Sequence, residues 1–552
     1  SDNPIRKYAQ KIDSLLDQIR ICDPAIGSGA FPMGLLLEIY KAKMNLNLTL
    51  DPAEVKKNII QNSIYGVDIE KGAVDIARLR FWLSLVVDEE VPRPLPNLDF
   101  KIMQGNSLLE SFLGVDLRFS FSKLKMETYS EVDLFGRLLN PQISFTEFLQ
   151  TQQTAAAFNF TELEEKFFDN SNLQEKKIIR NKVYEFEKKF IIQQLEEKIS
   201  ELNRKLNKTI NEYEQFKKLN KSLLIEKPSN NGEEKKKKTA LRKLKLYEKE
   251  ITSLNSEIIK LENGIIQIED MSIDEKPYFL WHLYFMDIFQ NGGFDIVIGN
   301  PPYIQLQKMG ADSKILEVEG YKTFSRTGDI YCLFYELGSN ILKPNGILTY
   351  ITSNTWMRTK FGELLRKFFI DNINPIKLIN FEDTQIFQTV TVETNIIILK
   401  KQNYSNNLQA AALRSDYILG TPLAPYFQNN SVEINNLSSE SWVILPAKDY
   451  LIKNTIAKVG TQLKDWDIEF YRGFLTGHNE AFFLDKSQKD FLIKNEPNAS
   501  SLIKPLVRGR NIRKYAYTFD DLYVLFIPWH FPLVEEDIVG ASKEAEEKFK
   551  EE

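Results

Sequence analysis

Residues 300–303, the tetrapeptide Asn-Pro-Pro-Tyr, directly follow the strand-like run FDIVIG. Asn before Pro favours an extended backbone, and Pro301 and Pro302 fix φ and lack amide hydrogens. The side-chain oxygen of Asn300 and the backbone oxygen of Pro301 are therefore predicted to point outward as acceptors. Such a pair fits an exocyclic NH2 group and leaves its nitrogen lone pair free to attack, while Tyr303 offers a ring face to a planar base. The alternative is a purely structural Pro-Pro turn.

A second chemistry-bearing stretch, DPAIGSGAF, lies between a strand-like run and a helix-like run at residues 23–31. Gly27 and Gly29 allow a ligand to approach the backbone, and the following helix start adds partial positive charge. A dinucleotide loop would carry Gly at position 32, where this chain has Pro32. Asp23 would repel a pyrophosphate but suits an ammonium group, such as the methionine end of S-adenosylmethionine. A structural turn is the competing interpretation.

Two polar residues fall at the ends of the next two predicted strands. Asp68 in YGVDIE could accept both hydroxyls of a ribose, and Asn106 in MQGNSLLE could bind the edge of an adenine. Each residue alone is also a common turn or helix cap. Together with Asp23, in order along the chain, they favour a cofactor made of adenosine and an amino acid.

The last part of the chain interleaves basic and aromatic residues. Four basic residues lie close to two tyrosines and are predicted to bind DNA phosphates: Arg508, Arg510, Arg513 and Lys514. The Gly-rich stretch YRGFLTGHNE adds candidate DNA contacts: Arg472, Thr476, His478 and Asn479. Solvated basic residues on a loop and a structural turn are the alternatives.

The stretches DPAIGSGAF, YGVDIE, GNSL and GGFDIVIGNPPYI together resemble the motifs of gamma-order amino-group DNA methyltransferases. The later stretches YRGFLTGHNEAFFLD and LIKPLVRGRNIRKY resemble in particular the large type IIG restriction-modification enzymes and related phage-defence adenine methyltransferases. The resemblance implies transfer of a methyl group from S-adenosylmethionine to N6 of an adenine flipped out of double-stranded DNA. Cytosine N4 remains an alternative target atom.

The resemblance also implies roles for single residues. Asp23 and Gly27 would lie near the methionine moiety, Asp68 on the ribose and Asn106 near the cofactor adenine, although family members often carry Asp at this last position. The expected cofactor contacts are Asp23, Pro24, Ala25, Gly27, Gly29, Phe31, Asp68, Ile69, Asn106, Ser107 and Asn300. The expected catalytic residues are Asn300, Pro301, Pro302 and Tyr303. Phe387 is expected on the far side of the flipped base, with Phe381 as the second choice and a core position as the alternative.

Bulk composition limits the class of protein. The 552 residues include 71 Lys and Arg against 76 Asp and Glu, so the molecule is not a polycation and any nucleic-acid site must be a local patch. Cys22 and Cys332 are the only cysteines and lack metal-ligand spacing, so neither a zinc site nor a disulfide framework is expected. No apolar run has the length of a membrane span. We expect a cytoplasmic protein of a bacterium or archaeon with no metal and no membrane contact.

The positions of strand-like and helix-like runs predict the domains. Residues 1–150 and 271–420 alternate such runs, which predicts a Rossmann-like α/β methyltransferase sheet in two halves, one for the cofactor and one for catalysis. Between them, residues 160–270 contain two heptad-like helices around EKPSNNGEEKKKK, which predicts an antiparallel coiled-coil hairpin. The predicted contact positions are Leu195, Ile199, Leu202, Leu206, Ile210 and Tyr213 in the first helix and Leu241, Leu244, Tyr247, Ile251, Leu254, Ile258, Leu261, Ile265 and Ile268 in the second. The lysine run there could contact phosphate or simply face water. Residues 421–552 are predicted to form a mixed α+β target-recognition domain.

Both ends of the chain look cut, so we expect a fragment with a truncated recognition domain. The segment that usually precedes the cofactor loop and the nuclease domain of type IIG enzymes are both missing, so the fragment is expected to methylate and not to cut. A nuclease domain or subunit could lie outside it. Two other functions remain open: methylation of a protein glutamine amide, which also presents a planar NH2 group, and a DNA-binding specificity module without activity.

Overall fold

The computed structural model describes residues 4–46, 50–87, 98–118, 173–225, 228, 231–272, 276–382, 393–414, 417–418, 420–445, 447–461, 463–469 and 479–527. By its contacts the chain divides into two compact units, Ser1–Lys453 and Asn454–Glu552. This division lies after the predicted domain boundary at 420, because the strand at Val432–Ile434 still pairs with the large sheet of the first unit.

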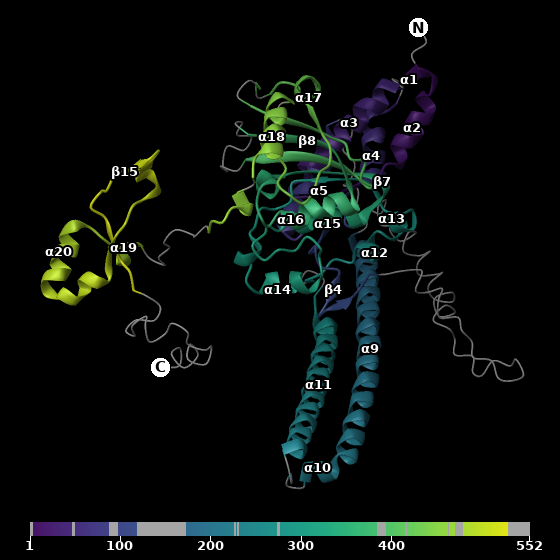
Figure 1. Ribbon diagram of the computed structural model, residues 1–552. Coiled ribbons are helices and arrows are strands. Elements are labelled where there is room, and N and C mark those ends of the chain that lie inside the picture. The colour runs from purple at the N-terminus through teal and green to yellow at the C-terminus, as the bar shows by residue number, and fades with distance from the viewer. Residues whose placement is uncertain are drawn as a thin grey trace, which may run out of the picture. The chain divides into compact units, whose positions relative to one another are not determined.

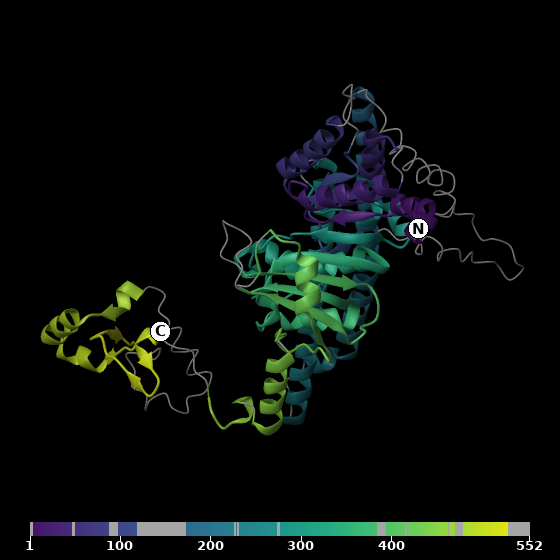
Figure 2. The same cartoon turned by 90° about the horizontal axis from the view of Figure 1, so that it is seen from above.

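In its described residues, the first unit is built on a mixed sheet of nine strands. In spatial order they are β11 (Val432–Ile434), β10 (Leu408–Leu413), β8 (Asn374–Phe381), β9 (Thr394–Lys400), β7 (Leu342–Ser353), β6 (Phe294–Gly299), β1 (Ile21–Asp23), β2 (Ile64–Asp68) and β3 (Ile102–Gln104). The five strands from β7 to β3 are parallel to one another, whereas β9 lies antiparallel between β7 and β8. Figure 2 shows strands from the purple and the teal-to-green parts of the chain side by side. The predicted α/β class is confirmed.

The sheet separates two hydrophobic cores, because side chains alternate between its faces along each strand. On one face Ile21 and Ile64 pack against three helices of the N-terminal segment: α3 (Ala30–Leu46), α4 (Pro52–Ser63) and α5 (Lys71–Val86). On the other face Cys22, Tyr65 and Val297 pack in a larger aromatic cluster. The helices that contribute to this cluster include α12 (Trp281–Tyr284), α13 (Met286–Gln290), α15 (Tyr331–Ile341) and α16 (Glu363–Asn372).

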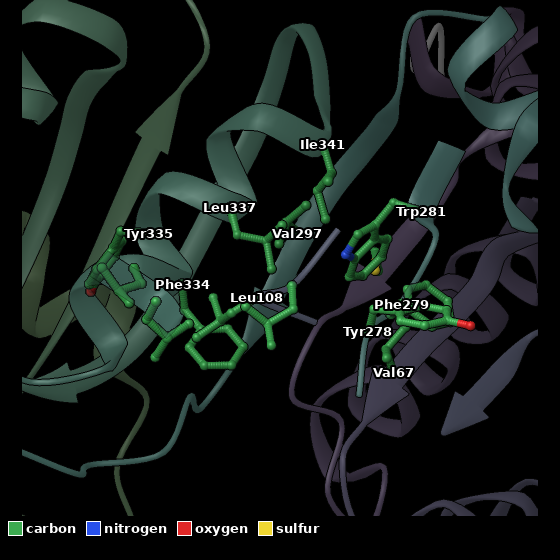
Figure 3. Packing of buried hydrophobic residues seen from close by; sticks show 14 of the residues in the cluster. Val67, Leu108, Tyr278, Phe279, Trp281, Val297, Phe334, Tyr335, Leu337 and Ile341 are labelled. Atoms are coloured by element: carbon green, nitrogen blue, oxygen red, sulfur yellow. The ribbon is translucent and has the colours of Figure 1, made fainter. Parts of the chain in front are cut away.

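Trp281 lies at the centre of the larger cluster. It is fully buried, its indole Nε1 donates a hydrogen bond to the Ser107 backbone oxygen at 2.9 Å, and its ring contacts Phe279 at 5.0 Å between centroids. Figure 3 shows Trp281 with Val297 of β6 and with Leu337 and Ile341 of α15. Trp281 at the start of α12 therefore holds the loop after β3 in place.

Two long helices, α9 (Leu173–Leu219) and α11 (Asn231–Asp270), pack along each other and leave the sheet together, with the short α10 (Lys221–Ile225) at their far end (Figure 1). Cross-contacts run antiparallel, since Lys188 bonds to the Glu269 backbone oxygen while Tyr213 bonds to Glu248. Most predicted contact positions are buried, among them Leu195, Leu202, Leu206, Leu244, Leu254, Ile258, Leu261 and Ile268. Leu241 is instead 44% exposed. The preceding residue, Ala240, is buried on the contact side, and Leu241 points away because successive helix residues are rotated by about 100°.

A short hairpin supports the near end of this helix pair. Its strands are β4 (Ser111–Phe112) and β5 (Val115–Asp116), and Leu113 at its turn packs against Gly264 of α11. Helix α14 (Ala311–Val318) follows the Asn-Pro-Pro-Tyr loop, and Glu319 directly after it accepts a hydrogen bond from Ser111. The helix pair is thus anchored to the same unit that carries the sheet.

The described part of the second unit contains two small sheets. One has the order β12 (Phe483–Leu484), β16 (Tyr523–Leu525) and β13 (Ile503–Pro505), and the other pairs β14 (Ile512–Arg513) with β15 (Ala516–Tyr517). The helices α19 (Asn479–Phe482) and α20 (Lys486–Asn495) flank β12. Asp485 starts α20 with a capping box in which Gln488 returns the hydrogen bond.

Candidate active site

The two predicted chemical loops lie at adjacent strand ends. Strands β1 and β6 are parallel neighbours; DPAIGSGAF begins at Asp23, the last residue of β1, and Asn-Pro-Pro-Tyr directly follows β6. From β1 the chain continues to β2 on one side, and from β6 it continues to β7 on the other. Such a reversal of strand order opens a crevice at the carboxyl edge of an α/β sheet, which is where these folds bind ligands.

Asp23 and Gly299 touch across this crevice. A Cβ atom built at Gly299 would lie 2.5 Å from Oδ1 of Asp23, so no larger residue fits at position 299 without moving the carboxyl group. Gly299 immediately precedes Asn300. The contact therefore fixes the spacing between the carboxyl group on β1 and the amide after β6.

The Asp23 carboxyl group is buried, with 1% of the residue exposed. Its Oδ1 accepts a hydrogen bond from the Ala25 backbone at 3.0 Å. Burial raises the pKa of Asp23 to about 8; the bond from Ala25 opposes this shift and the charge of Asp68 adds to it. A carboxyl group in this state gains most from a cationic ligand, because the cation offsets the cost of ionising a buried acid.

The turn after Asp23 leaves room beside it. Gly27 and Gly29 have φ of +52° and +79°, which is the left-handed region that favours glycine. The Gly27 backbone N–H donates to Oδ2 of Asp68 at 2.8 Å, and nothing lies within 4 Å of a Cβ atom built at Gly27. Asp68 thus holds the turn while the space above Gly27 stays open.

The remaining predicted cofactor residues surround this turn. Oδ1 of Asp68 accepts from the Glu70 backbone at 2.9 Å, and Ile69 beside it is 61% exposed. Ser107 donates to the Pro24 backbone oxygen at 2.6 Å and so ties the third loop to the first. Oδ1 of Asn106 caps the Leu108 backbone N–H at 3.2 Å, so its amide oxygen already has a local partner. Ala25 and Phe31 are half-buried at the two ends of the turn.

The Asn-Pro-Pro-Tyr loop is held by its own tyrosine. The Tyr303 hydroxyl donates to Oδ1 of Asn300 at 2.9 Å and lies 3.3 Å from the Ile351 backbone oxygen of β7. Burial, with a smaller effect of the nearby Asp329 carboxylate, raises the pKa of Tyr303, so the hydroxyl stays protonated and acts as a donor. Pro301 is buried and Pro302 exposed, with Asn300 half-buried between the strand and the crevice.

Three residues that sequence reasoning missed complete this side of the crevice. The Tyr331 ring meets the Tyr303 ring edge-on at 5.9 Å, and its hydroxyl lies 3.1 Å from Oγ1 of Thr355. Oδ1 of Asp329 accepts from the Ile304 backbone at 2.9 Å. The stretch TSNTW at the end of β7 was the available signal for Thr355, since polar residues at a strand end of this edge repeat the pattern of Asp23 and Asp68.

Several predicted site residues are not placed near this crevice by the structure. Phe387, Arg472, Thr476 and His478 lie outside the described residues. Phe381, the second choice for the far side of a base, is 2% exposed at the end of β8. It is a core residue here.

The predicted DNA contacts of the second unit are exposed. Arg508, Arg510, Arg513 and Lys514 all face solvent, and Asn479 begins α19. Arg513 and Lys514 lie on the β14–β15 hairpin, where Tyr515 is 95% exposed with a positive φ of 64°. A hairpin that displays cations and an exposed ring can contact a phosphate backbone and a base.

Other features limit the chemistry of the described residues. A pocket of about 850 Å³ lies at the opposite edge of the sheet, lined by Arg20, Lys101 and Asp295, and has no part in the crevice. Within the described ranges no cluster of three or more His, Cys, Asp or Glu could hold a metal ion. None of the helices there is long and apolar enough to cross a membrane.

Two protein families match the chain. The family described as Eco57I restriction-modification methylase matches residues 62–387, and the family described as MmeI, DNA-methyltransferase domain, matches residues 2–93. The first match covers both Asp68 and the whole Asn-Pro-Pro-Tyr loop, and the second covers the loop after β1.

Individual relatives are enzymes of restriction-modification systems. A putative type II restriction enzyme and methyltransferase of Methanocaldococcus jannaschii is 27% identical over 407 residues, which are 70% of this chain and 30% of that protein. The type II restriction enzyme and methyltransferase Eco57I of Escherichia coli is 30% identical over 171 residues, 30% of this chain and 17% of that enzyme. The chain thus spans less than a third of either relative. Among solved structures, the type IIL restriction-modification enzyme MmeI in complex with DNA aligns with 99% of this chain and 49% of that chain, at 11% identity and a TM-score of 0.45.

Proposed function

The chain belongs to the Eco57I family of restriction-modification methylases, and from this premise we propose that it methylates the N6 amino group of adenine in a specific duplex DNA sequence, using S-adenosylmethionine, within a restriction-modification or phage-defence system. The observation that carries the proposal is the contact between Asp23 and Gly299, which brings the predicted cofactor loop against the residue that precedes Asn300. A methyl donor held by the first loop and an amino group held by the second would then face each other.

The residues around β1 and β2 fit S-adenosylmethionine. Asp23 is a buried carboxyl group with a raised pKa, which an ammonium group would neutralise. Asp68 offers the oxygen lone pairs that its two backbone hydrogen bonds leave over, and Ile69 offers an exposed apolar face for a purine ring. The bound cofactor supplies an electrophilic methyl group on a positively charged sulfur.

The residues after β6 fit an amino group on a planar ring. Asn300 and the Pro301 backbone supply acceptors for its two hydrogens, which directs the nitrogen lone pair out of conjugation with the ring. Tyr303 contributes a ring face, and the Tyr331 ring against its edge keeps it in place. No general base is needed before transfer, because the methylated nitrogen can lose its proton afterwards; catalysis then rests on positioning and electrostatics.

The partner proposed for the second unit is the DNA backbone. Its exposed Arg508, Arg510, Arg513 and Lys514 would contact phosphates, and Asn479 with the residues before it would help to read the sequence. The helix pair α9 and α11 is proposed to be a coiled-coil insertion in the methyltransferase domain. Since the Escherichia coli relative is named as both a restriction enzyme and a methyltransferase, a nuclease domain or subunit outside this chain is also proposed.

The test is transfer of labelled methyl from S-adenosylmethionine to mixed-sequence duplex DNA, followed by digestion to nucleosides. We expect label in N6-methyladenosine, and a loss of about a hundredfold or more in Asn300→Ala. Asn340→Ala, which removes an exposed asparagine side chain of α15, is the matched control and should retain full activity.

The same assay separates the alternatives. Label in N4-methylcytosine would correct the target atom, and label in protein glutamine would replace DNA as the substrate. Cofactor binding without any methyl transfer to DNA would favour the third alternative, a DNA-binding specificity module without activity. In that case Asn300→Ala should not change the affinity for DNA.

A further inference from the structure

The far end of the helix pair concentrates positive charge. We define the basic tip as residues 214–225 and 231–245, which hold ten Lys and Arg against three Glu. The chain as a whole has a formal charge of −5. Figure 1 shows this end, around α10, away from the sheet. The tip is therefore an isolated cation cluster on a protein that is otherwise acidic.

The cluster is made by folding, because it joins residues from two helices. Lys243 of α11 lies over the ring of Phe216 of α9 at 4.7 Å, and the rings of Tyr213 and Tyr247 meet edge-on at 6.3 Å. These contacts bring the lysines near the end of α9 beside the lysine run that begins α11. The exposed lysines of the tip include Lys217, Lys218, Lys221, Lys235, Lys236 and Lys238.

Three lysines of the tip differ in their ion pairs from lysines nearer the sheet. Nearer the sheet, Lys198 pairs with Glu201 at 2.9 Å and Lys205 reaches Glu250 on the other helix at 3.5 Å. Among the residues that the structure describes, no carboxylate pairs with Lys235, Lys236 or Lys238. Like charges three or four positions apart destabilise a helix, so a polyanion that binds here would relieve this repulsion.

The other end of the helix pair is fixed to the first unit. Tyr184 of α9 donates to the Met271 backbone oxygen at 2.5 Å, and Lys276 pairs with the buried Glu187 at 2.8 Å. The 40 residues of α11 span about 60 Å at 1.5 Å per residue, which is the length of about 18 base pairs. The tip can therefore reach phosphates well away from the base that enters the crevice.

We propose that the basic tip binds the phosphate backbone of duplex DNA outside the methylated site; this inference rests on the proposed function. The arrangement of the lysines favours DNA over a membrane surface. Successive side chains of a helix are rotated by about 100° about its axis, so the four lysines 235–238 point to all sides of α11. A helix that lies in a membrane interface instead keeps one apolar face. Sequence-independent contact with phosphates needs only exposed cations.

The experiment measures the salt dependence of DNA binding by the full chain. The tip variant carries Lys235→Gln, Lys236→Gln and Lys238→Gln. The control variant carries Lys189→Gln, Lys208→Gln and Lys249→Gln, which removes the same charge from exposed positions of the same two helices. Affinity for a mixed-sequence duplex of about 60 base pairs, longer than the span of α11, is recorded by fluorescence anisotropy over a range of salt concentrations.

A plot of log affinity against log salt concentration has a negative slope. In the tip variant we expect this slope to become less steep by about 0.9 for each phosphate that is no longer neutralised, up to about 2.7 in all. In the control variant the slope should stay unchanged. Equal slopes in the two variants would overturn the proposal. So would weaker binding of the tip variant to phosphatidylserine vesicles with an unchanged DNA slope, which would assign the tip to a membrane surface.

A crosslinking measurement gives an independent result. Because Cys22 and Cys332 are buried, a photoreactive thiol reagent can be directed to Lys236→Cys at the tip or to Ser256→Cys on the exposed side of α11. Crosslinks to DNA from position 236 and none from 256 support the proposal, and the reverse contradicts it. Failure of methyl transfer in the unmodified chain, with the slope difference and the crosslink intact, would refute the proposed function and leave the tip contact standing.

Discussion

Oδ1 of Asp23 lies only 2.5 Å from the position that a Cβ atom at residue 299 would occupy, so only glycine fits there without a shift of the carboxyl group. One contact thus couples the carboxyl group at the end of β1 to the loop that begins at Asn300. Because the two groups belong to neighbouring strands, a change on one side must displace the other.

Gly299→Ala should therefore weaken binding of S-adenosylmethionine as well as methyl transfer. The added methyl group pushes the Asp23 carboxyl group away, and overpacking of this kind costs about 1–3 kcal/mol. Calorimetric titration with the cofactor would measure the loss. Gly34→Ala adds the same methyl group on α3, where nothing lies within 4 Å, and should bind the cofactor normally. Equal affinity in both variants would show that the contact has no role.

The raised pKa of Asp23 predicts how stability depends on pH. Its folded pKa of about 8 exceeds the unfolded value of about 3.9, so the folded state binds the proton more tightly. The free energy of unfolding should fall as the pH rises between these two values, by a few kcal/mol at most. Asp23→Asn removes this loss and should be more stable than the wild type at pH 8, with little difference at pH 4. Urea unfolding at both pH values checks it, with the exposed Asp371→Asn as the control.

Cofactor binding should show the opposite trend with pH. An ammonium group favours the ionised form of Asp23, so binding below pH 8 requires release of the proton. Affinity should rise by up to about tenfold per pH unit between about pH 5.5 and 7. Calorimetry in buffers of different ionisation enthalpy would detect the released proton. A pH-independent affinity in the wild type, or proton release that persists in Asp23→Asn, would assign the ammonium site elsewhere.

The sequence was sufficient to predict that Asp23, Asp68 and Asn300 lie on one edge of the sheet. Parallel strands end on the same edge, and each of these residues follows or ends a recognisable apolar run. The α/β alternation and the two long helical segments were equally readable, since both depend on the local period of apolar residues.

Contacts between distant segments were not readable. The approach of Gly299 to Asp23 depends on how β6 lies beside β1, and the burial that raises the Asp23 pKa depends on every element packed around it. Tyr331 packs against Tyr303 from a segment about 30 residues later in the chain, and Thr355 lies beside the Tyr331 hydroxyl from 24 residues further on; the polar strand end at Thr355 does not by itself predict either contact. The exposure of Leu241 was missed for a related reason, because Ala240 and Leu241 satisfy the periodicity about equally well.

Two substitutions at Tyr303 separate its hydroxyl from its ring. Tyr303→Phe loses the hydrogen bond to Asn300 but keeps a stacking face, so kcat should fall by less than about tenfold. Tyr303→Ala also loses stacking, which contributes about 1–3 kcal/mol per base, so kcat/KM for DNA should fall by about 5- to 150-fold. Fluorescence of an adenine analogue at the target position would report whether the base still leaves the helix. If Phe is as impaired as Ala, the hydroxyl and not the ring carries the function.

The buried ion pair at the near end of the helix pair should be among the most sensitive points for stability. Glu187 of α9 is fully buried, and Nζ of Lys276 lies 2.8 Å from its Oε2 and 2.7 Å from the Tyr284 hydroxyl. Lys276→Met leaves a buried carboxylate without its cation, which costs about 3–5 kcal/mol.

Adding Glu187→Gln to Lys276→Met should restore most of this loss, because the double variant no longer buries an unpaired charge. Denaturant unfolding of the two single variants and the double variant gives the coupling energy directly. The exposed pair of Lys41 and Glu38 is the control, and Lys41→Met should cost about 1 kcal/mol or less. Additive losses in the double variant would mean that Lys276 stabilises α9 through packing against Tyr184 and Tyr284 and not through its charge.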